Sequence, residues 1–190
     1  NGKEVKIGSR LDAMKLGMAY LPEDRKAEGI IADLSVRENI IIAMQAKKGM
    51  FHPMSRKEME EAADKYIDML QIKTASRETP IKSLSGGNQQ KVCVARALTQ
   101  QPELLLVSEP TRGIDIGAKK LILDLLKSLA EERGMTIVMT SSELAELRSI
   151  CDRVLIICEG RVAGELKPEA SDEEYGLMMS SAHVSKEKEA

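Results

Sequence analysis

The sequence predicts an α/β fold built on a parallel β-sheet with helices on both faces. Two observations support this class: apolar runs at 104–107, 135–140 and 154–158, and intervening stretches in which apolar residues recur at helical spacing. A run that is apolar on both faces is typical of a parallel sheet covered on both sides, because a strand with one solvated face would alternate. The length of 190 residues suits one domain, or a domain with a small subdomain.

The first 34 residues are predicted to hold short elements around one buried strand. The alternating residues 5–7 indicate an edge strand, and residues 11–16 a short helix that follows an N-capping serine. The apolar run 18–21 ends at a proline and predicts a buried strand, whereas the charged residues 23–26 predict a loop.

The next segment, 35–80, is predicted to be mostly helical. Ser35 is the expected N-cap of a helix over 36–47. Ser55 begins a second helix, in which Glu58 stands at the position of a capping-box partner. Apolar residues follow one face of this second helix and charged residues the other, so one side is expected to pack and the other to be solvated.

The second half of the chain alternates predicted strands with predicted helices. Strands are expected over 104–107, 135–140, 154–158 and 161–166, and helices over 117–133 and from about residue 142. The order of these elements supports the parallel sheet, since helices connect neighbouring parallel strands.

The composition excludes several classes of function. The 28 Lys and Arg against 30 Asp and Glu give a net charge of −2, which excludes an overall basic nucleic-acid-binding surface. The apolar runs are far shorter than the about 20 residues of a membrane span. Three cysteines without a CxxC pair indicate free thiols in a reducing compartment, and two histidines make a zinc site unexpected.

The triplet Ser85-Gly86-Gly87 is the first candidate site, because it opens a predicted helix. Free backbone amides and the helix dipole both favour an anion at a helix N-terminus, and glycines allow a phosphate to approach closely. Taken alone, the triplet fits an ordinary capped helix start equally well.

A second candidate is Glu109, which directly follows the apolar strand and Ser108. Nucleotide hydrolases place the carboxylate that orients water or holds magnesium at the end of such a strand. The alternative is a loop that enters the next helix and carries a solvated glutamate.

Three segments together resemble the ATPase of ATP-binding cassette (ABC) transporters: LSGGNQQKV at 84–92, EPTRGID at 109–115 and TSSEL at 140–144. With EDRK at 23–26, the chain is most similar to the second, C-terminal cassette of the tandem ATPases that drive simple-sugar importers of the ribose, galactose and xylose type. The similarity extends from Gly2 to about residue 179. It implies a P-loop NTPase-like cassette with a helical signature subdomain, truncated before residue 1.

The resemblance divides the chain into four parts and assigns roles to single residues. The parts are a remnant of the nucleotide-binding core with the Q-loop (1–34), the helical subdomain with the signature helix (35–100), the core with Walker B, D-loop and switch loop (101–180), and a disordered tail (181–190). The signature residues, which in this family contact the γ-phosphate of ATP held by the opposing cassette, are Ser85, Gly86, Gly87, Asn88 and Gln89. Glu109 matches the catalytic glutamate, Asp115 the D-loop aspartate at the cassette–cassette interface, and Glu23 the Q-loop position.

The departures from the family pattern concern this cassette's own nucleotide site. The sequence contains no GxxxxGK[ST] phosphate loop, so the first strands and Walker A are expected to lie before residue 1. Ser108 stands at the Walker B aspartate position, Ser142 at the switch histidine position, and Glu23 replaces a glutamine. The signature itself is intact. We therefore expect a degenerate site of its own and a signature that serves the partner cassette in trans.

The resemblance implies the ATPase subunit of a sugar importer, peripheral on the inner face of the cell membrane. ATP and Mg²⁺ would be the cofactors of the parent protein, with neither these nor a metal bound by the fragment. The implied partners are the first cassette of the same protein, membrane permease subunits and, indirectly, a sugar-binding protein, but no nucleic acid. The exposed sheet edges also predict a homodimer of the fragment. The alternatives are a nucleoside importer ATPase, a non-transport ABC protein acting on ribosomes or DNA, and, for the isolated fragment, a non-catalytic interaction module.

Overall fold

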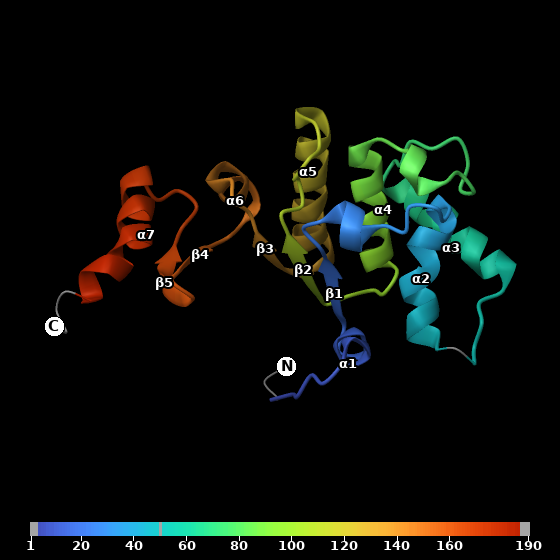
Figure 1. Ribbon diagram of the computed structural model, residues 1–190, viewed down its shortest axis with the longest axis horizontal. Helices are drawn as coiled ribbons and strands as arrows, with labels where there is room; N and C mark the ends of the chain where they lie inside the picture. The colour runs from blue at the N-terminus through green and yellow to red at the C-terminus, as the bar shows by residue number, and fades with distance from the viewer. Residues whose placement is uncertain (1–3, 50, 187–190) are drawn as a thin grey trace. The chain divides into compact units, whose positions relative to one another are not determined.

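A computed structural model describes residues 4–49 and 51–186 and divides the chain into two compact units, Asn1–Thr140 and Ser141–Ala190 (Figure 1). The first unit holds α1 (Arg10–Lys15), β1 (Met18–Leu21), a π-helical turn (Arg25–Gly29), α2 (Val36–Lys48), α3 (Arg56–Met69), a 3₁₀ turn (Ile81–Ser83), α4 (Gly86–Leu98), β2 (Leu104–Ser108), α5 (Ile116–Arg133) and β3 (Thr136–Thr140). The second unit holds α6 (Leu144–Ile150), β4 (Val154–Cys158), β5 (Arg161–Leu166) and α7 (Asp172–Lys186).

The first unit is built on a three-stranded parallel sheet in the order β1-β2-β3. Met18 pairs with Leu104, and Leu104 pairs with Thr136, so the carboxyl ends of the three strands meet at one edge. The helices α2, α3 and α4 connect β1 to β2, and α5 connects β2 to β3. The predicted α/β class and the parallel sheet are confirmed.

The two faces of this sheet are covered unequally in the described part of the unit. The buried side chains are Ala19, Leu21, Leu105 and Val107. Tyr20 and Val138, which point to the other face, remain 56% and 53% exposed. An apolar run predicts that a strand packs in a sheet, but it does not give the extent of the cover on each face.

Two predictions near the N-terminus are wrong. Residues 5–7 form no strand, since both apolar side chains, Val5 and Ile7, are about half exposed and the backbone joins no sheet. The charged loop at 23–26 runs instead into the π-helical turn Arg25–Gly29, which Asp24 caps by accepting from the amides of residues 26 and 27 at 2.9 Å each.

The helical subdomain follows the predicted capping. Ser35 and Ser55 each start a helix through a capping box, with Glu38 and Glu58 as the reciprocal partners. The two helices contact each other, and α2 also packs on α4. The side chains of Val36 and Ile40 in α2, and of Val92 and Val94 in α4, are fully buried.

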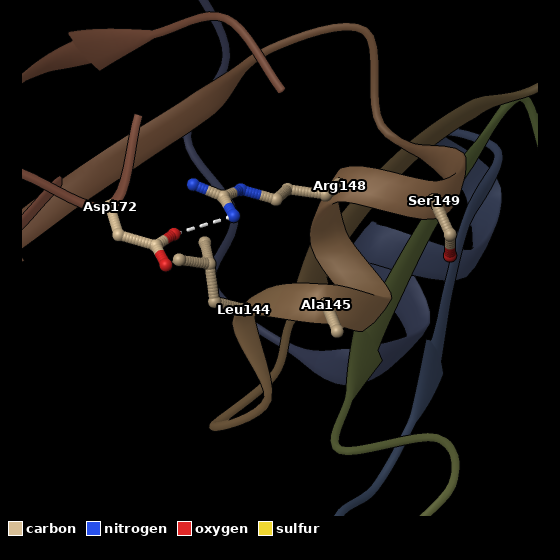
Figure 2. A pocket seen from close by; sticks show the side chains of 5 residues that line it. All are labelled: Leu144, Ala145, Arg148, Ser149 and Asp172. Atoms are coloured by element: carbon tan, nitrogen blue, oxygen red, sulfur yellow. Dashed lines mark ion pairs between the residues drawn. The ribbon is translucent and has the colours of Figure 1, made fainter. Parts of the chain in front are cut away.

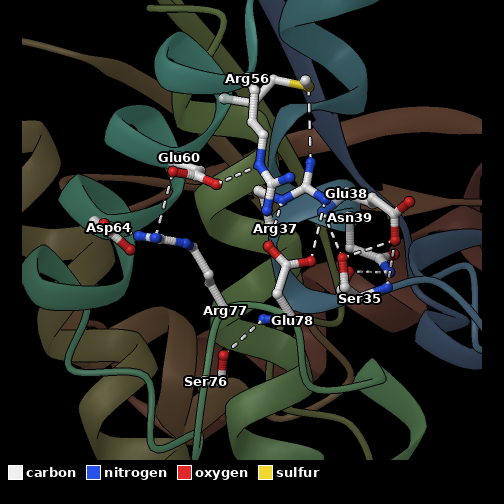
Figure 3. A network of polar contacts seen from close by, with 11 residues as sticks. Ser35, Arg37, Glu38, Asn39, Arg56, Glu60, Asp64, Ser76, Arg77 and Glu78 are labelled. Carbon is white, nitrogen blue, oxygen red and sulfur yellow. Dashed lines mark hydrogen bonds and ion pairs between the residues drawn. The ribbon is translucent and has the colours of Figure 1, made fainter.

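A network of ion pairs fixes the loop that leads into α4 (Figure 3). Arg37 on α2 donates to both carboxylate oxygens of Glu78, at 2.8 and 3.1 Å. Arg77 pairs with Asp64 and lies 3.4 Å from Glu60, both on α3. The loop is thus tied by neighbouring arginine and glutamate residues to both helices, which limits the positions open to the start of α4.

The second unit is an antiparallel hairpin packed on a helix. β4 pairs with β5, with a register shift at Ile156 and Ile157. The core consists of Val154, Ile156 and Tyr175, the last on α7. The expected strands are confirmed, but they form a sheet of their own rather than extending the parallel sheet.

The C-terminal helix departs from the expected tail. Residues 181–186 belong to α7, where the sequence predicted a disordered tail from 181; residues 187–190 lie outside the described part of the chain. These residues continue the helix that begins at Asp172. Its start is capped by Ser171, whose hydroxyl accepts from the amide of Glu174 at 3.2 Å. Within 4–49 and 51–186, no helix is long and apolar enough to span a lipid bilayer.

Candidate functional site

The first candidate residues lie at the N-terminus of α4. Ser85 is the N-cap in extended conformation and is exposed, whereas Gly86 and Gly87 form the first helical positions. The Ser85 hydroxyl accepts from Asn88 Nδ2 at 2.9 Å, and Asn88 Oδ1 accepts from the amide of Lys73 at 2.8 Å. Asn88 therefore orients the serine and joins it to the preceding loop. The amides of a helix's first turn, with the dipole behind them, favour an anion at this edge.

The two glycines are required because α4 begins against the segment that precedes α5. A Cβ placed on Gly86 would lie 3.3 Å from the carbonyl oxygen of Gly113 and 3.6 Å from Ile114 Cγ2. A Cβ on Gly87 would lie 2.6 Å from Ala118 Cβ, closer than two carbon atoms approach. The predicted signature residues and the predicted D-loop are thus in contact.

Asp115 has a structural part in this contact. It is the N-cap of α5, and its Oδ1 accepts from the amide of Ala118 at 2.9 Å. The cap fixes the first turn of α5, which presents Ala118 to Gly87. The aspartate that the resemblance places at the D-loop therefore also shapes the surface on which the signature rests.

Arg25 is a site residue that the sequence reasoning missed. Its Nε donates to Gln89 Oε1 at 3.3 Å, and its Nη1 donates to the carbonyl oxygen of Arg112 at 3.4 Å. Only 9% of the residue is exposed, although it belongs to a run of four charged residues that predicted a solvated loop. A single arginine in a charged run gives no local signal that its side chain turns inward.

Glu23 lies at the same junction. Its carboxylate forms an ion pair with Arg112, so the predicted Q-loop position contacts the segment between β2 and α5. Both side chains are about half exposed or more, and the pair on its own is therefore worth no more than about 1 kcal/mol.

The carboxyl end of β2 carries the second candidate pair. Glu109 has a φ of 43°, and its amide donates to the carbonyl of Thr140 at 2.9 Å. This left-handed backbone conformation costs a non-glycine residue about 1 kcal/mol or more, and such strain is concentrated at functional sites. The hydroxyl of Ser108 accepts from Thr140 Oγ1 at 3.2 Å.

These residues do not by themselves fit a magnesium site. Ser108 offers a hydroxyl already engaged with Thr140, in place of a carboxylate. Glu109 is then the single carboxylate at the end of β2. A magnesium ion at a nucleotide is held by one or two carboxylates together with phosphate oxygens, so these residues would complete such a site only with a bound nucleotide. The groups that the chain offers at this end of β2 are the carboxylate of Glu109 and the two bonded hydroxyls of Ser108 and Thr140.

Ser142 belongs to the second unit, whereas the other candidate residues all belong to the first. It lies in the turn that precedes α6, whose N-cap is Glu143. The neighbouring Ser141 organises this turn, since its hydroxyl accepts from the amide of Glu143 at 3.0 Å and donates to Glu146 Oε2 at 2.7 Å.

Burial changes the acidity of two side chains on α4. Burial, and then the charge of Lys73, lowers the pKa of Lys91, whose Nζ donates to the carbonyl of Gln71 at 3.1 Å. Burial raises the pKa of the Cys93 thiol to about 11, and this thiol donates to the carbonyl of Gly29 at 3.2 Å. Cys93 is therefore an inert packing residue at neutral pH.

A hollow in the second unit has a structural explanation (Figure 2). It is lined by Leu144, Ala145, Arg148, Ser149 and Asp172. Arg148 pairs with Asp172 at 2.7 Å, donates to the carbonyl of Ala170 at 2.7 Å and lies over the ring of Tyr175 at 4.8 Å. The arginine is thus engaged in holding α6 to the start of α7.

Comparisons with known proteins identify the family. A family model described as ABC transporter matches residues 1–112. The galactofuranose transporter ATP-binding protein YtfR of Escherichia coli (strain K12) is 47% identical over 165 residues, which are 87% of this chain and 33% of that protein. The ribose import ATP-binding protein RbsA of Bacillus cereus is 45% identical over 174 residues, 91% of this chain and 35% of that protein.

Solved structures show the same architecture. The dimeric post-hydrolysis state of the ATP-binding cassette MJ0796, bound to ADP and Pi, matches with a TM-score of 0.68 and 27% identity, over 81% of this chain and 64% of that one. The chain spans about a third of the length of the curated relatives it matches.

Proposed function

Because the chain belongs to the ABC transporter family, we propose that it is part of the ATP-binding subunit of a simple-sugar importer, which couples ATP hydrolysis to transport. The names of its relatives, which import galactofuranose and ribose, support a sugar as the cargo. The alternative cargo is a nucleoside. In this proposal the permease and the binding protein contact the cargo, so the ATP-binding subunit does not distinguish a sugar from a nucleoside.

The signature end of α4 supplies its contacts to ATP held by another cassette. The observation that carries this proposal is the seating of Gly86 and Gly87 against the segment before α5, with the Ser85 hydroxyl and the first-turn amides at the exposed edge. Hydroxyl and amide donors at a helix N-terminus match the oxygens and the charge of a γ-phosphate. Ser85, Gly86 and Gly87 would then act in trans, as the resemblance implies. Of the other two signature residues, Asn88 would orient Ser85, whereas Gln89 is buried and bonded to Arg25, so it would support the helix start from within the chain.

The chain's own nucleotide site is weak in the same proposal. Ser108 replaces a carboxylate and is bonded to Thr140, while Ser142 has no ring nitrogen to stabilise a phosphate charge. Glu109 keeps the position from which a carboxylate orients water, in a strained backbone conformation. In this proposal the chain taken by itself would be inactive toward ATP, because its sequence holds no phosphate loop to bind the β- and γ-phosphates.

The proposed partners follow from the same assignment. They are the first cassette of the same protein, which would face Ser85 and Asp115, and the membrane permease subunits, which would contact the helical subdomain around α2 and α3. The sugar-binding protein would act through the permease. The subunit would be peripheral on the inner face of the cell membrane. In the alternative of a pure interaction module, the fold alone would serve as a docking surface.

Changing Ser85→Arg in the full-length protein tests this function. The long cationic side chain would occupy the place of the γ-phosphate and block the first-turn amides. We expect the steady-state ATPase rate to fall at least tenfold, a loss of about 1.4 kcal/mol of transition-state stabilisation.

Ser9→Arg is the matched control, since Ser9 is also an exposed helix N-cap and accepts from the amide of Asp12 at 3.2 Å. Losing the Ser9 cap lowers the free energy of unfolding by about 1 kcal/mol. The start of α4, which is proposed to face the phosphate, is left unchanged. If Ser85→Arg retained the ATPase rate of the Ser9→Arg protein, the trans-acting signature would be excluded.

A further inference from the structure

We propose that Arg25 is a positioning residue that locks the start of α4 to the segment 112–115, so that both meet an incoming nucleotide as one rigid surface. The inference rests on the function proposed above. It adds a residue that lies outside the signature and outside the segment before α5. The buried guanidinium of this residue would hold the signature and that segment together.

The backbone around Arg25 is built to turn this side chain inward. Asp24 caps the π-helical turn at its first residue, and the amide of Ile30 donates to the carbonyl of Arg25 at the other end of the turn. The flanking charged residues 23, 24 and 26 are all exposed, whereas Arg25 is buried. The turn therefore selects one side chain of the charged run and directs it to α4.

The guanidinium lies over the glycine that begins α4. A Cβ on Gly86 would come within 3.2 Å of Arg25 Nη2 and within 3.3 Å of the Gly113 carbonyl. The absence of a side chain at position 86 thus lets the guanidinium and the Gly113 backbone approach the helix start from neighbouring directions. Any larger residue at this position would separate the three groups.

The two acceptors of Arg25 belong to two different segments. Gln89 Oε1 lies on the first turn of α4, and the carbonyl of Arg112 lies in the segment before α5. Burying a charge is costly unless it is hydrogen-bonded, so the guanidinium favours the arrangement in which both acceptors stay in place. Losing either contact leaves a buried charge with fewer partners.

Gln89 is itself held in the orientation that Arg25 needs. Its Nε2 donates to the carbonyl of Leu84 at 3.1 Å and to that of Ile81 at 3.3 Å, which turns Oε1 toward the guanidinium. The chain of contacts therefore runs from the 3₁₀ turn through Gln89 and Arg25 to Arg112. The ion pair of Glu23 with Arg112 closes the same junction from the solvent side.

This chain of contacts gives Arg25 an effect on rate rather than on nucleotide affinity. In the function proposed above, the nucleotide is held by the opposing cassette, and the signature adds only the donors at the start of α4. A displacement of about 1 Å at such a completing group can cost on the order of 10²-fold in rate. Loosening the junction should therefore lower kcat more than it changes KM for ATP.

The test compares Arg25→Met with Arg96→Met in the full-length protein. Arg96 is the matched control because, like Arg25, it donates to one side-chain amide oxygen and one backbone carbonyl, in its case both on Asn39 at 2.7 Å. Methionine keeps much of the aliphatic stem and removes the guanidinium in each case. Hydrogen exchange is followed in peptides covering 84–92 and 111–118. The values of kcat and KM for ATP are measured at a temperature at which both variants are folded.

We expect Arg25→Met to speed exchange in both peptides and to lower kcat about 10- to 100-fold, with KM for ATP changed less than about threefold. Arg96→Met should lower the unfolding temperature while leaving kcat and exchange at 111–118 close to those of the parent. Arg25→Lys should recover only part of the loss, since an ammonium group lacks the fork that reaches both acceptors.

Unchanged exchange in both peptides of Arg25→Met would overturn the proposal, as would equal losses of kcat in the two methionine variants. The exchange result is independent of the proposed function. If Ser85→Arg retained ATPase activity while Arg25→Met still loosened both peptides, the function would fail and the positioning would stand.

Discussion

Gly87→Ala is expected to destabilise the first unit by about 1–3 kcal/mol and to suppress ATPase activity. The added methyl group would lie 2.6 Å from Ala118 Cβ, whereas two such carbons pack at about 3.5–4.0 Å, so α4 and α5 would have to separate by about 1 Å. That displacement falls on the first turn of α4, where it moves the backbone amides that we propose to face a phosphate. Urea unfolding and the steady-state ATPase rate of the full-length protein measure the two effects.

Ala118→Gly should rescue this variant. Without the Ala118 methyl group, the nearest atom of residue 118 is its Cα, 4.0 Å from the new Cβ, which is ordinary contact. A double-mutant cycle should therefore show a coupling energy of about 0.5–3 kcal/mol between positions 87 and 118. Gly176→Ala is the control, because a Cβ at this helical glycine meets no described atom within 4 Å. Equal unfolding curves for Gly87→Ala and Gly176→Ala would contradict the predicted clash.

The residues that the sequence predicted well are those whose role is encoded locally. Ser35 and Ser55 were identified as N-caps because the capping pattern spans only four residues. The start of a helix at Ser85, Gly86 and Gly87 is confirmed for the same reason, whereas the binding of a phosphate there stays a prediction. In each case the physical cause lies within one turn of the chain, so the sequence alone contains it.

Contacts between distant segments were not predicted. Arg25 and its acceptors on residues 89 and 112 are separated by 64 and 87 positions, and each looks like an ordinary polar surface residue on its own. Two further features also depend on contacts between segments that are distant in the sequence. They are the pairing of β4 with β5 in a separate sheet and the exposure of Tyr20 on its strand. An apolar run indicates that a strand is buried but does not specify its neighbour.

Asn39 is another buried polar residue without a local signal, and Asn39→Ala is expected to cost about 2–3 kcal/mol of folding free energy. Its side chain is fully buried and donates to the carbonyls of Ile31, Leu34 and Ser35 at 3.0–3.2 Å. Its Oδ1 accepts from the amide of Ile31 at 2.9 Å and from Arg96 Nη2 at 2.7 Å. Alanine removes all of these bonds. The three carbonyls each keep a backbone donor, whereas the amide of Ile31 and Nη2 of Arg96 lose the acceptor that Asn39 gave them.

Urea unfolding measures the free energy of unfolding of Asn39→Ala and of Asn88→Ala, in which the same substitution is made at a half-buried asparagine. Asn88 makes side-chain bonds to Ser85 and Lys73 and should cost about 1 kcal/mol or less. A similar cost for the two variants would refute the special role of Asn39. The double variant Asn39→Ala, Arg96→Met should lose less than the sum of its parts, because the bond between Arg96 Nη2 and Asn39 Oδ1 is lost in both single variants but only once in the double variant. The packing of α2 on α4 would then be shown to depend in part on this side-chain bond, while the bond from Arg96 Nε to the backbone carbonyl of residue 39 accounts for what remains.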